Sequence, residues 1–183
     1  MLLIRGGRVI DPVREVDEIM DVMIEGSQIV ETGKALKVPA DAEVIDATGL
    51  VVAPGLMDAH VHFRDPGLTY KEDIETGAAA AARGGFTTVV CMANTKPVVD
   101  NLETLSYVQE KGEQTPIHVL QAAAITKGLQ GKELVDMEAL ADAGAAGFTD
   151  DGIPLMDEKL LVQAMEQAKA LSLPLALHKE DPA

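Results

Sequence analysis

Two histidines separated by a single residue are the most informative chemical feature of the sequence. His60 and His62 lie at the end of a strand predicted over residues 56–63. Residues two apart on a strand point to the same face, about 6.5 Å apart along the chain, so their imidazoles can converge on one metal ion. Neutral imidazole nitrogens are suitable ligands for zinc. The alternative is two unrelated histidines at a strand end.

Further side chains of metal-binding type follow later predicted strands. His178 ends a strand predicted over residues 175–178, and Asp150 and Asp151 follow a short strand. A carboxylate at that position either coordinates metal or forms a turn before Gly152. The spacing does not decide between the two aspartates. Together with the histidine pair, these residues place candidate ligands at the same end of three predicted strands, which favours a metal site.

Two more polar residues lie where they could bind an anionic ligand. Arg64 follows His62 by two residues, and a guanidinium holds a carboxylate through two parallel hydrogen bonds. Asn94 ends the second predicted strand, and its amide can donate and accept. A surface ion pair for Arg64 and a turn role for Asn94 are the alternatives. His118 lies at the opposite end of its strand and is interpreted as structural.

The elements that must position these residues fall into two parts. Residues 1–52 show short strands with intervening turns, including one at Gly6-Gly7, and predict a small β-domain without an identifiable catalytic residue. Residues 53–183 show strands that alternate with helices, which indicates parallel βα units and an α/β fold. The predicted strands cover residues 56–63, 86–92, 117–123, a short segment ending at Thr149, and 175–178; the predicted helices cover 71–83, 101–111, 133–143 and 158–171.

Five strands and four helices fit two architectures. An eightfold βα barrel takes about 250 residues, so residues 53–183 would form about half of one. An open doubly wound sheet of five strands would be complete at this length. Residues 63–67, after the first strand, lack the glycine-rich dinucleotide fingerprint, which disfavours a nucleotide-binding sheet.

Composition excludes several classes of protein. The chain carries 30 acidic and 15 basic residues, a formal charge of −15, with three Phe, two Tyr and no Trp. This field and this lack of aromatics argue against binding to nucleic acid or to an anionic membrane. Apolar stretches are too short to span a bilayer and the N-terminus lacks a signal-peptide pattern, so we expect a cytoplasmic protein. The single cysteine, Cys91, excludes an intrachain disulfide and is predicted to be a buried core thiol.

Several motifs resemble those of dihydroorotase, a family of the amidohydrolase superfamily of metal-dependent (β/α)8 TIM barrels. The resemblance covers essentially the whole chain, including a small β-sandwich domain that family members build from both chain ends. Hydantoinases and allantoinases share the histidine pair, and hydantoinases typically use a carbamylated lysine where this chain has aspartate. Two departures are Ala93 in place of Pro and Lys179 in place of Cys. The motifs are residues 53–56 (APGL), 58–67 (DAHVHFRDPG), 92–97 (MANTKP), 148–152 (FTDDG) and 178–181 (HKED).

The resemblance implies a zinc-dependent enzyme that reversibly cyclises N-carbamoyl-L-aspartate to L-dihydroorotate in pyrimidine synthesis. It favours Asp151 over Asp150 as the carboxylate ligand, and it implies that Arg64 and Asn94 bind the substrate carboxylate. It also allows a homodimer and association with aspartate transcarbamoylase. The implied ligands of one or two zinc ions are His60, His62, Asp151 and His178.

The resemblance also implies that part of the site lies elsewhere. The aspartate that acts as general base, and a further histidine ligand, are expected downstream of Ala183, so no catalytic base is assigned within this chain. We therefore expect the N-terminal part of a longer enzyme that is inactive by itself. The alternatives are another cyclic amidohydrolase, of hydantoinase or allantoinase type, and a non-catalytic homologue that acts as an assembly partner.

Overall fold

The computed structural model describes residues 1–180; the chain end at Ala183 lies outside the described residues. The chain divides into two compact units, Met1–Pro54 and Gly55–Ala183, which are described separately. Among residues 1–180, no helix has the length and apolar character needed to cross a membrane.

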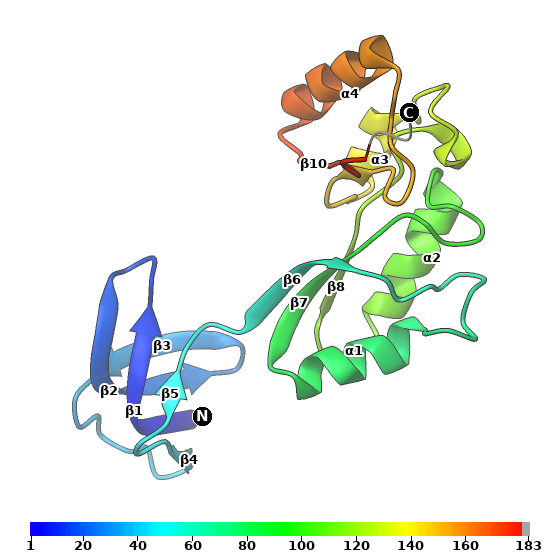
Figure 1. Ribbon diagram of the computed structural model, residues 1–183. Helices are drawn as coiled ribbons and strands as arrows, with labels where there is room; N and C mark the ends of the chain where they lie inside the picture. The colour runs from blue at the N-terminus through cyan, green and yellow to red at the C-terminus, as the bar shows by residue number, and fades with distance from the viewer. Residues whose placement is uncertain (181–183) are drawn as a thin grey trace. The chain divides into compact units, whose positions relative to one another are not determined.

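The first unit is one five-stranded sheet (Figure 1). Its order is β3-β2-β1-β4, and β5 also pairs with β1. The pairs β1–β2 and β2–β3 are antiparallel, whereas β4 and β5 run parallel to β1. The strands are β1 (Leu2–Asp11), β2 (Val16–Glu25), β3 (Gln28–Gly33), β4 (Glu43–Asp46) and β5 (Val51–Val52).

The turn predicted at Gly6-Gly7 is wrong. Strand β1 continues through both glycines, and its register against β2 shifts between Ile4 and Gly7, which is a β-bulge. Gly6 has a φ of +68°, a conformation that favours glycine, and its N–H donates to Asp21 Oδ1 at 2.8 Å. The glycine pair therefore bends a strand instead of ending it.

The second unit alternates strands with helices. All four predicted helices are present, but α1 begins three residues later than expected. Asp73 caps this helix, because its carboxylate accepts a hydrogen bond from Thr76 N. The elements are β6 (Leu56–Val61), α1 (Ile74–Arg83), β7 (Phe86–Cys91), α2 (Leu102–Gly112), β8 (His118–Gln121), the 3₁₀ helix η1 (Lys127–Leu129), α3 (Met137–Asp142), β9 (Phe148–Thr149), α4 (Glu158–Leu171) and β10 (Leu175–Ala176).

The order of these strands distinguishes the two architectures that the sequence left open. Strands β6, β7 and β8 form a parallel sheet in that order, and β9 pairs in parallel with β10. A parallel bridge between Ala123 and Phe148 links the segment after β8 to β9. Spatial order thus follows chain order throughout, as in a βα barrel, whereas a doubly wound sheet reverses direction at a switch point.

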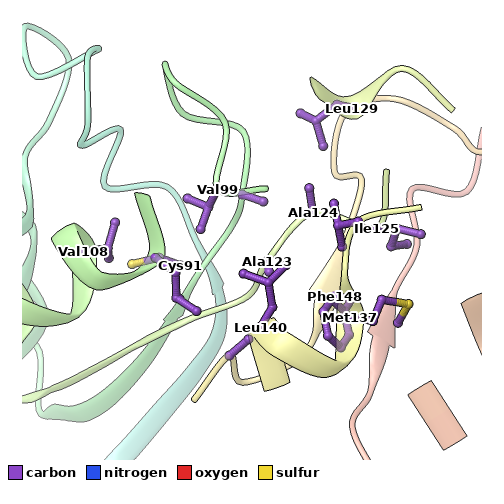
Figure 2. Close-up of a cluster of buried hydrophobic side chains, with 14 of the residues drawn as sticks. Cys91, Val99, Val108, Ala123, Ala124, Ile125, Leu129, Met137, Leu140 and Phe148 are labelled. Carbon is purple, nitrogen blue, oxygen red and sulfur yellow. The ribbon is translucent and has the colours of Figure 1, made fainter. Parts of the chain in front are cut away.

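The core of the second unit lies between these strands and the helices (Figure 2). Leu105 and Val108 from α2 and Met137 and Leu140 from α3 are almost completely buried in it. Cys91 belongs to the same cluster, and burial raises the pKa of its thiol to about 12. The prediction of a buried core thiol is confirmed.

Candidate metal centre

The end of β6 presents the two histidines through an irregular backbone. Asp58 pairs with Val89 of β7 and Val61 with Cys91, so three residue steps on β6 match two on β7. This mismatch is a β-bulge, a feature that re-aims side chains. Asp58 Oδ1 accepts a hydrogen bond from the His60 N–H within it, at 3.0 Å.

The predicted end of this strand, at residue 63, is wrong. The strand ends at Val61, so His62 lies just beyond it and not inside a strand that continues to residue 63. The imidazole rings of His60 and His62 nevertheless approach each other, with centroids 5.2 Å apart and planes at 68°. The two rings converge because of the bulge and the strand end rather than through regular alternation.

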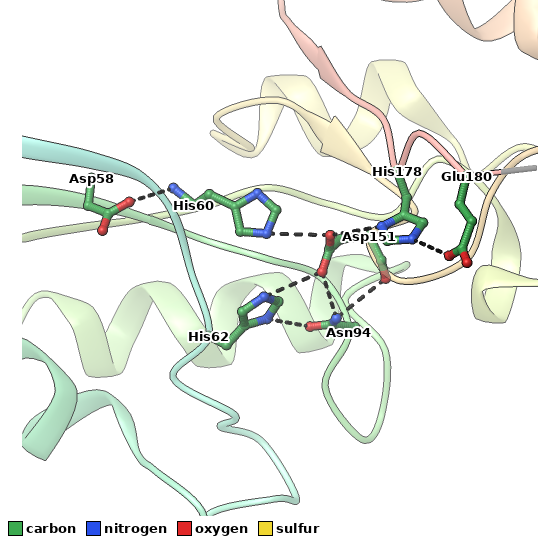
Figure 3. A network of polar contacts seen from close by, with 7 residues as sticks. All are labelled: Asp58, His60, His62, Asn94, Asp151, His178 and Glu180. Carbon is green, nitrogen blue, oxygen red and sulfur yellow. Dashed lines mark hydrogen bonds and ion pairs between the residues drawn. The ribbon is translucent and has the colours of Figure 1, made fainter.

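Asp151, which follows β9, joins the histidines. Its carboxylate places Oδ1 3.4 Å from His60 Nε2 and Oδ2 3.4 Å from His62 Nε2 (Figure 3). One donor atom from each of these three residues lies within 4.8 Å of the others. Neighbouring ligands of a tetrahedral ion with bonds of about 2.0–2.1 Å lie about 3.4 Å apart. Two imidazoles and a carboxylate at these separations fit a divalent transition metal.

The adjacent aspartate, Asp150, binds backbone N–H groups and not the histidines. Asp150 is buried, and its Oδ1 accepts hydrogen bonds from Ile125 N at 2.8 Å and Thr126 N at 3.0 Å. Its Oδ2 accepts from the Thr126 hydroxyl. Burial raises the pKa of Asp150, and these hydrogen bonds oppose that rise. Asp150 therefore ties the segment after β8 to the end of β9, while Asp151 faces the histidines.

Asn94, after β7, connects two members of the cluster. Its Nδ2 donates to Asp151 Oδ2 at 3.0 Å, and its Oδ1 lies 3.0 Å from His62 Nδ1. A carboxylate only accepts, so the amide nitrogen must face Asp151 and the amide oxygen must face His62. An amide oxygen also only accepts, so Nδ1 of His62 must be the donor in this contact, and in the neutral imidazole the lone pair then lies on Nε2. That is the tautomer a metal ligand needs.

These contacts of Asn94 were not predicted from the sequence. The predicted role of Asn94 is to bind the substrate carboxylate, and that role stays a prediction. The position of Asn94 could have indicated these contacts. Asn94 follows β7, which is the direct neighbour of β6 in the sheet, so the residues that follow these two strands lie close together.

His178 approaches the cluster from the other side. It follows β10, and its Nδ1 lies 3.9 Å from Asp151 Oδ1. Its Nε2 lies 3.0 Å from Glu180 Oε2, a partner that the sequence analysis did not single out. His178 thus faces the same carboxylate as the other two histidines without belonging to the tight group of three donors.

The remaining candidates lie apart from these contacts. Within residues 1–180, the Arg64 guanidinium makes no hydrogen bond or ion pair, and Arg64 has an unusual φ of +60°. His118 is exposed at the first residue of β8 and belongs to no donor group in the described part of the chain. The structure thus brings together His60, His62, Asn94, Asp151 and His178.

Consecutive parallel strands with histidine and aspartate donors clustered after their ends define part of an amidohydrolase-type βα barrel. Solved structures support this class. L-hydantoinase from Arthrobacter aurescens superposes with a TM-score of 0.84 at 21% identity, over 98% of this chain and 41% of that one. D-hydantoinase from Thermus sp. superposes with a TM-score of 0.78 at 28% identity, over 99% and 40% respectively. Proteins of this superfamily are typically metal-dependent.

Sequence comparison narrows the class to a family. Residues 49–183 match the dihydro-orotase-like family. The chain is 62% identical over 182 residues to a dihydroorotase of Clostridioides difficile and 55% identical to one of Clostridium acetobutylicum. It therefore belongs to the dihydroorotase-like family. The whole chain is matched in both cases, and it spans about 43% of the length of each relative.

Proposed function

We propose that the full-length protein is a zinc-dependent dihydroorotase and that this chain contributes its first metal-binding strands. The reaction is the reversible cyclisation of N-carbamoyl-L-aspartate to L-dihydroorotate in pyrimidine synthesis. The supporting observation is the mutual approach of His60, His62 and Asp151 within 4.8 Å, in a chain that is 62% identical to a dihydroorotase.

Zinc fits the donor set, and we assign His60, His62, Asp151 and His178 to hold it. When bound, zinc supplies a Lewis acid that polarises the amide carbonyl of the substrate ring. The Nε2 atoms of His60 and His62 and the Nδ1 atom of His178 face Asp151, so these nitrogens are the ones offered to metal. Asn94 orients His62 and Asp151 through its amide. The measured ratio of zinc to protein in the purified enzyme would distinguish one bound ion from two.

Substrate binding and proton transfer are divided between this chain and later residues. In the hydrolytic direction a ring C–N bond breaks, the carbon gains the hydroxyl of water, and the nitrogen gains a proton. Arg64 pairs with the substrate carboxylate and orients the ring, which lowers the entropic part of the barrier. Proton transfer is assigned to an aspartate downstream of Ala183, so the isolated chain is expected to be inactive.

Turnover of three cyclic amides by the full-length protein tests the proposal. We expect zinc to copurify and dihydroorotate to be preferred over hydantoin and allantoin. Preference for hydantoin or allantoin would instead identify another cyclic amidohydrolase, the reading suggested by the structural neighbours. A folded, zinc-loaded protein without any turnover would favour a non-catalytic assembly role.

The substrate role of Arg64 has its own test. Arg64→Ala should raise KM for dihydroorotate about 10–100-fold, because a charge-assisted pair contributes about 1.5–3 kcal/mol. Zinc content should not change. Arg83→Ala, at the exposed end of α1, is the matched control and should leave KM unaltered. Full substrate affinity in Arg64→Ala would refute the assignment.

The proposal also covers the location, oligomeric state and partner of the enzyme. We infer a cytoplasmic homodimer that can associate with aspartate transcarbamoylase, as the family resemblance implies. Light scattering of the full-length protein measures the dimer. Copurification with aspartate transcarbamoylase from the native source measures the association, and its absence would remove that partner.

A further inference from the structure

Asp65 is a buried carboxylate that neither the metal centre nor the proposed reaction uses. It lies in the segment between β6 and α1 and is 3% exposed. Tyr107 Oη donates to its Oδ1 at 2.9 Å, and Lys111 Nζ donates to its Oδ2 at 2.7 Å. Both partners lie on α2. A carboxylate is rarely buried unless its position matters to the fold or to a site.

The position of Asp65 matters because of the residue before it. Arg64 adopts φ +60°, a conformation that costs a non-glycine residue energy and persists only where its surroundings impose it. On one side, Phe63 is buried against α1, so closely that a Cβ on Gly77 would lie 2.4 Å from its ring. On the other side, Asp65 is held by α2. Arg64 is thus bracketed by two buried anchors.

The same segment is joined to the one that carries Asn94. Lys96 N donates to Pro66 O at 3.0 Å. A Cβ on Gly67 would lie only 1.6 Å from Lys96 O, so the two backbones touch directly. Because Lys96 follows Asn94 by two residues, the anchor on α2 supports both segments that carry the proposed substrate-binding side chains.

We propose that Asp65 is a positioning residue for substrate-carboxylate recognition, acting through Tyr107 and Lys111 to hold the backbone conformation that presents Arg64. The inference rests on the proposed function, since it takes the role of Arg64 from there. The hydrogen bond from Lys111 to Asp65 raises the pKa of Lys111, in agreement with a charged pair. Both carboxylate oxygens of Asp65 accept hydrogen bonds from side chains on α2, so its proposed effect on substrate is exerted through Arg64.

Asp65→Asn in the full-length enzyme tests the proposal. The amide keeps the shape and can still accept from Tyr107, but its NH₂ group then faces the Lys111 ammonium. We expect KM for dihydroorotate to rise about tenfold, because small displacements of a positioning group cost that much or more. The value of kcat should stay within about twofold and zinc content should not change. An unchanged KM, a fall in kcat alone, or loss of zinc would overturn the proposal.

A double-mutant cycle separates positioning from general stability. If Asp65 acts chiefly by presenting Arg64, then Asp65→Asn should raise KM far less in an Arg64→Ala background than in wild type. Additive effects of the two substitutions would contradict the proposal. Glu133→Gln is the matched control, because it removes the exposed ion pair of Lys127 and should leave KM unaltered.

Two further measurements keep the proposal testable if the variant or the proposed function fails. Should Asp65→Asn not fold, Tyr107→Phe and Lys111→Met each remove one hydrogen bond and should each raise KM with kcat retained. Should the wild-type protein not turn over dihydroorotate, the proposed function fails, and hydrogen exchange still tests the anchor. The amides of Leu68 and Lys96 donate hydrogen bonds to the carbonyl oxygens of Arg64 and Pro66. They should exchange faster in Asp65→Asn than in wild type. Unchanged exchange would overturn the proposal.

Discussion

Residues 1–54 and residues 55–180 each bury an aspartate that accepts two backbone N–H groups. Asp21 in β2 accepts from Gly6 and Leu36, and Asp150 after β9 accepts from Ile125 and Thr126. Both are at most 4% exposed. The two interactions are alike in chemistry, since each carboxylate accepts from two backbone N–H groups, which belong to half-buried residues in the first unit and to buried residues in the second.

The two units differ in the residue that follows the buried aspartate. Val22 follows Asp21 and is buried in the core of the first unit. Asp151 follows Asp150 and faces His60 and His62. The same kind of anchoring interaction therefore precedes a core residue in one unit and a candidate metal donor in the other. Substitution of the buried aspartate in the first unit should therefore lower stability without affecting metal binding. Substitution of the one in the second unit should lower both.

The largest effect is expected at Asp151. Loss of an outer-shell partner alone costs about 10–100-fold in metal affinity, so loss of a direct donor in Asp151→Asn should cost more than about 100-fold. Turnover should fall with zinc content, while the metal-free fold is retained. Metal analysis and kinetics of the full-length protein measure this, with the exposed Asp142→Asn as control. Zinc retained at the wild-type level would remove Asp151 from the ligand set.

Asn94→Ala should have the next largest effect. His62 Nδ1 and Asp151 Oδ2 both lose a hydrogen-bond partner, so zinc affinity should fall about 10–100-fold. Competition with a chelator measures the affinity. Arg64→Ala is the comparison variant, because it should leave zinc affinity unchanged. If Asn94 contacts substrate only, the two variants will bind zinc equally well.

Asp21→Ala and Asp150→Ala test the comparison directly. Each leaves two backbone donors unpaired and should destabilise its own unit by about 1–3 kcal/mol. Segment-resolved hydrogen exchange should localise the first effect to residues 2–46 and the second to the segment around Thr126. Zinc affinity should fall in Asp150→Ala only. Weakened zinc binding in Asp21→Ala would break the distinction between the units.

The smallest effect concerns pH. The hydrogen bond to Asp65 raises the pKa of Lys111 above its unfolded value of about 10.4, so the pair stabilises fully below that pH and less as pH rises through the raised value. The melting-temperature difference between wild type and Asp65→Asn should stay constant from about pH 7 to 10 and shrink above that range. It should be small, because Lys111 is 45% exposed. A difference that disappears below pH 9 would contradict this titration.

Periodicity predicted the alternation of strands and helices, the four helices and the burial of Cys91. It did not predict the bulges at Gly6 and in β6, because a bulge is defined by the mismatch in pairing with the neighbouring strand, and the pattern of a single strand does not show that pairing. Helix α3 is shorter than its pattern, since its first turn depends on a cap at Asp136. These differences arise where local hydrogen bonds override propensity.

Residue types, their order and their placement at strand ends predicted that His60, His62, an aspartate and His178 lie together at one site. Spacing could not choose between the two aspartates and the family resemblance favoured Asp151, but only the tertiary structure shows that Asp151 faces the histidines and that Asn94 joins His62 to Asp151. Asp150 and Asp151 are chemically identical neighbours, so the choice between them depends on partners 25 and more residues away, at Ile125 and His60. Contacts of that range exist only after the strands have been placed side by side.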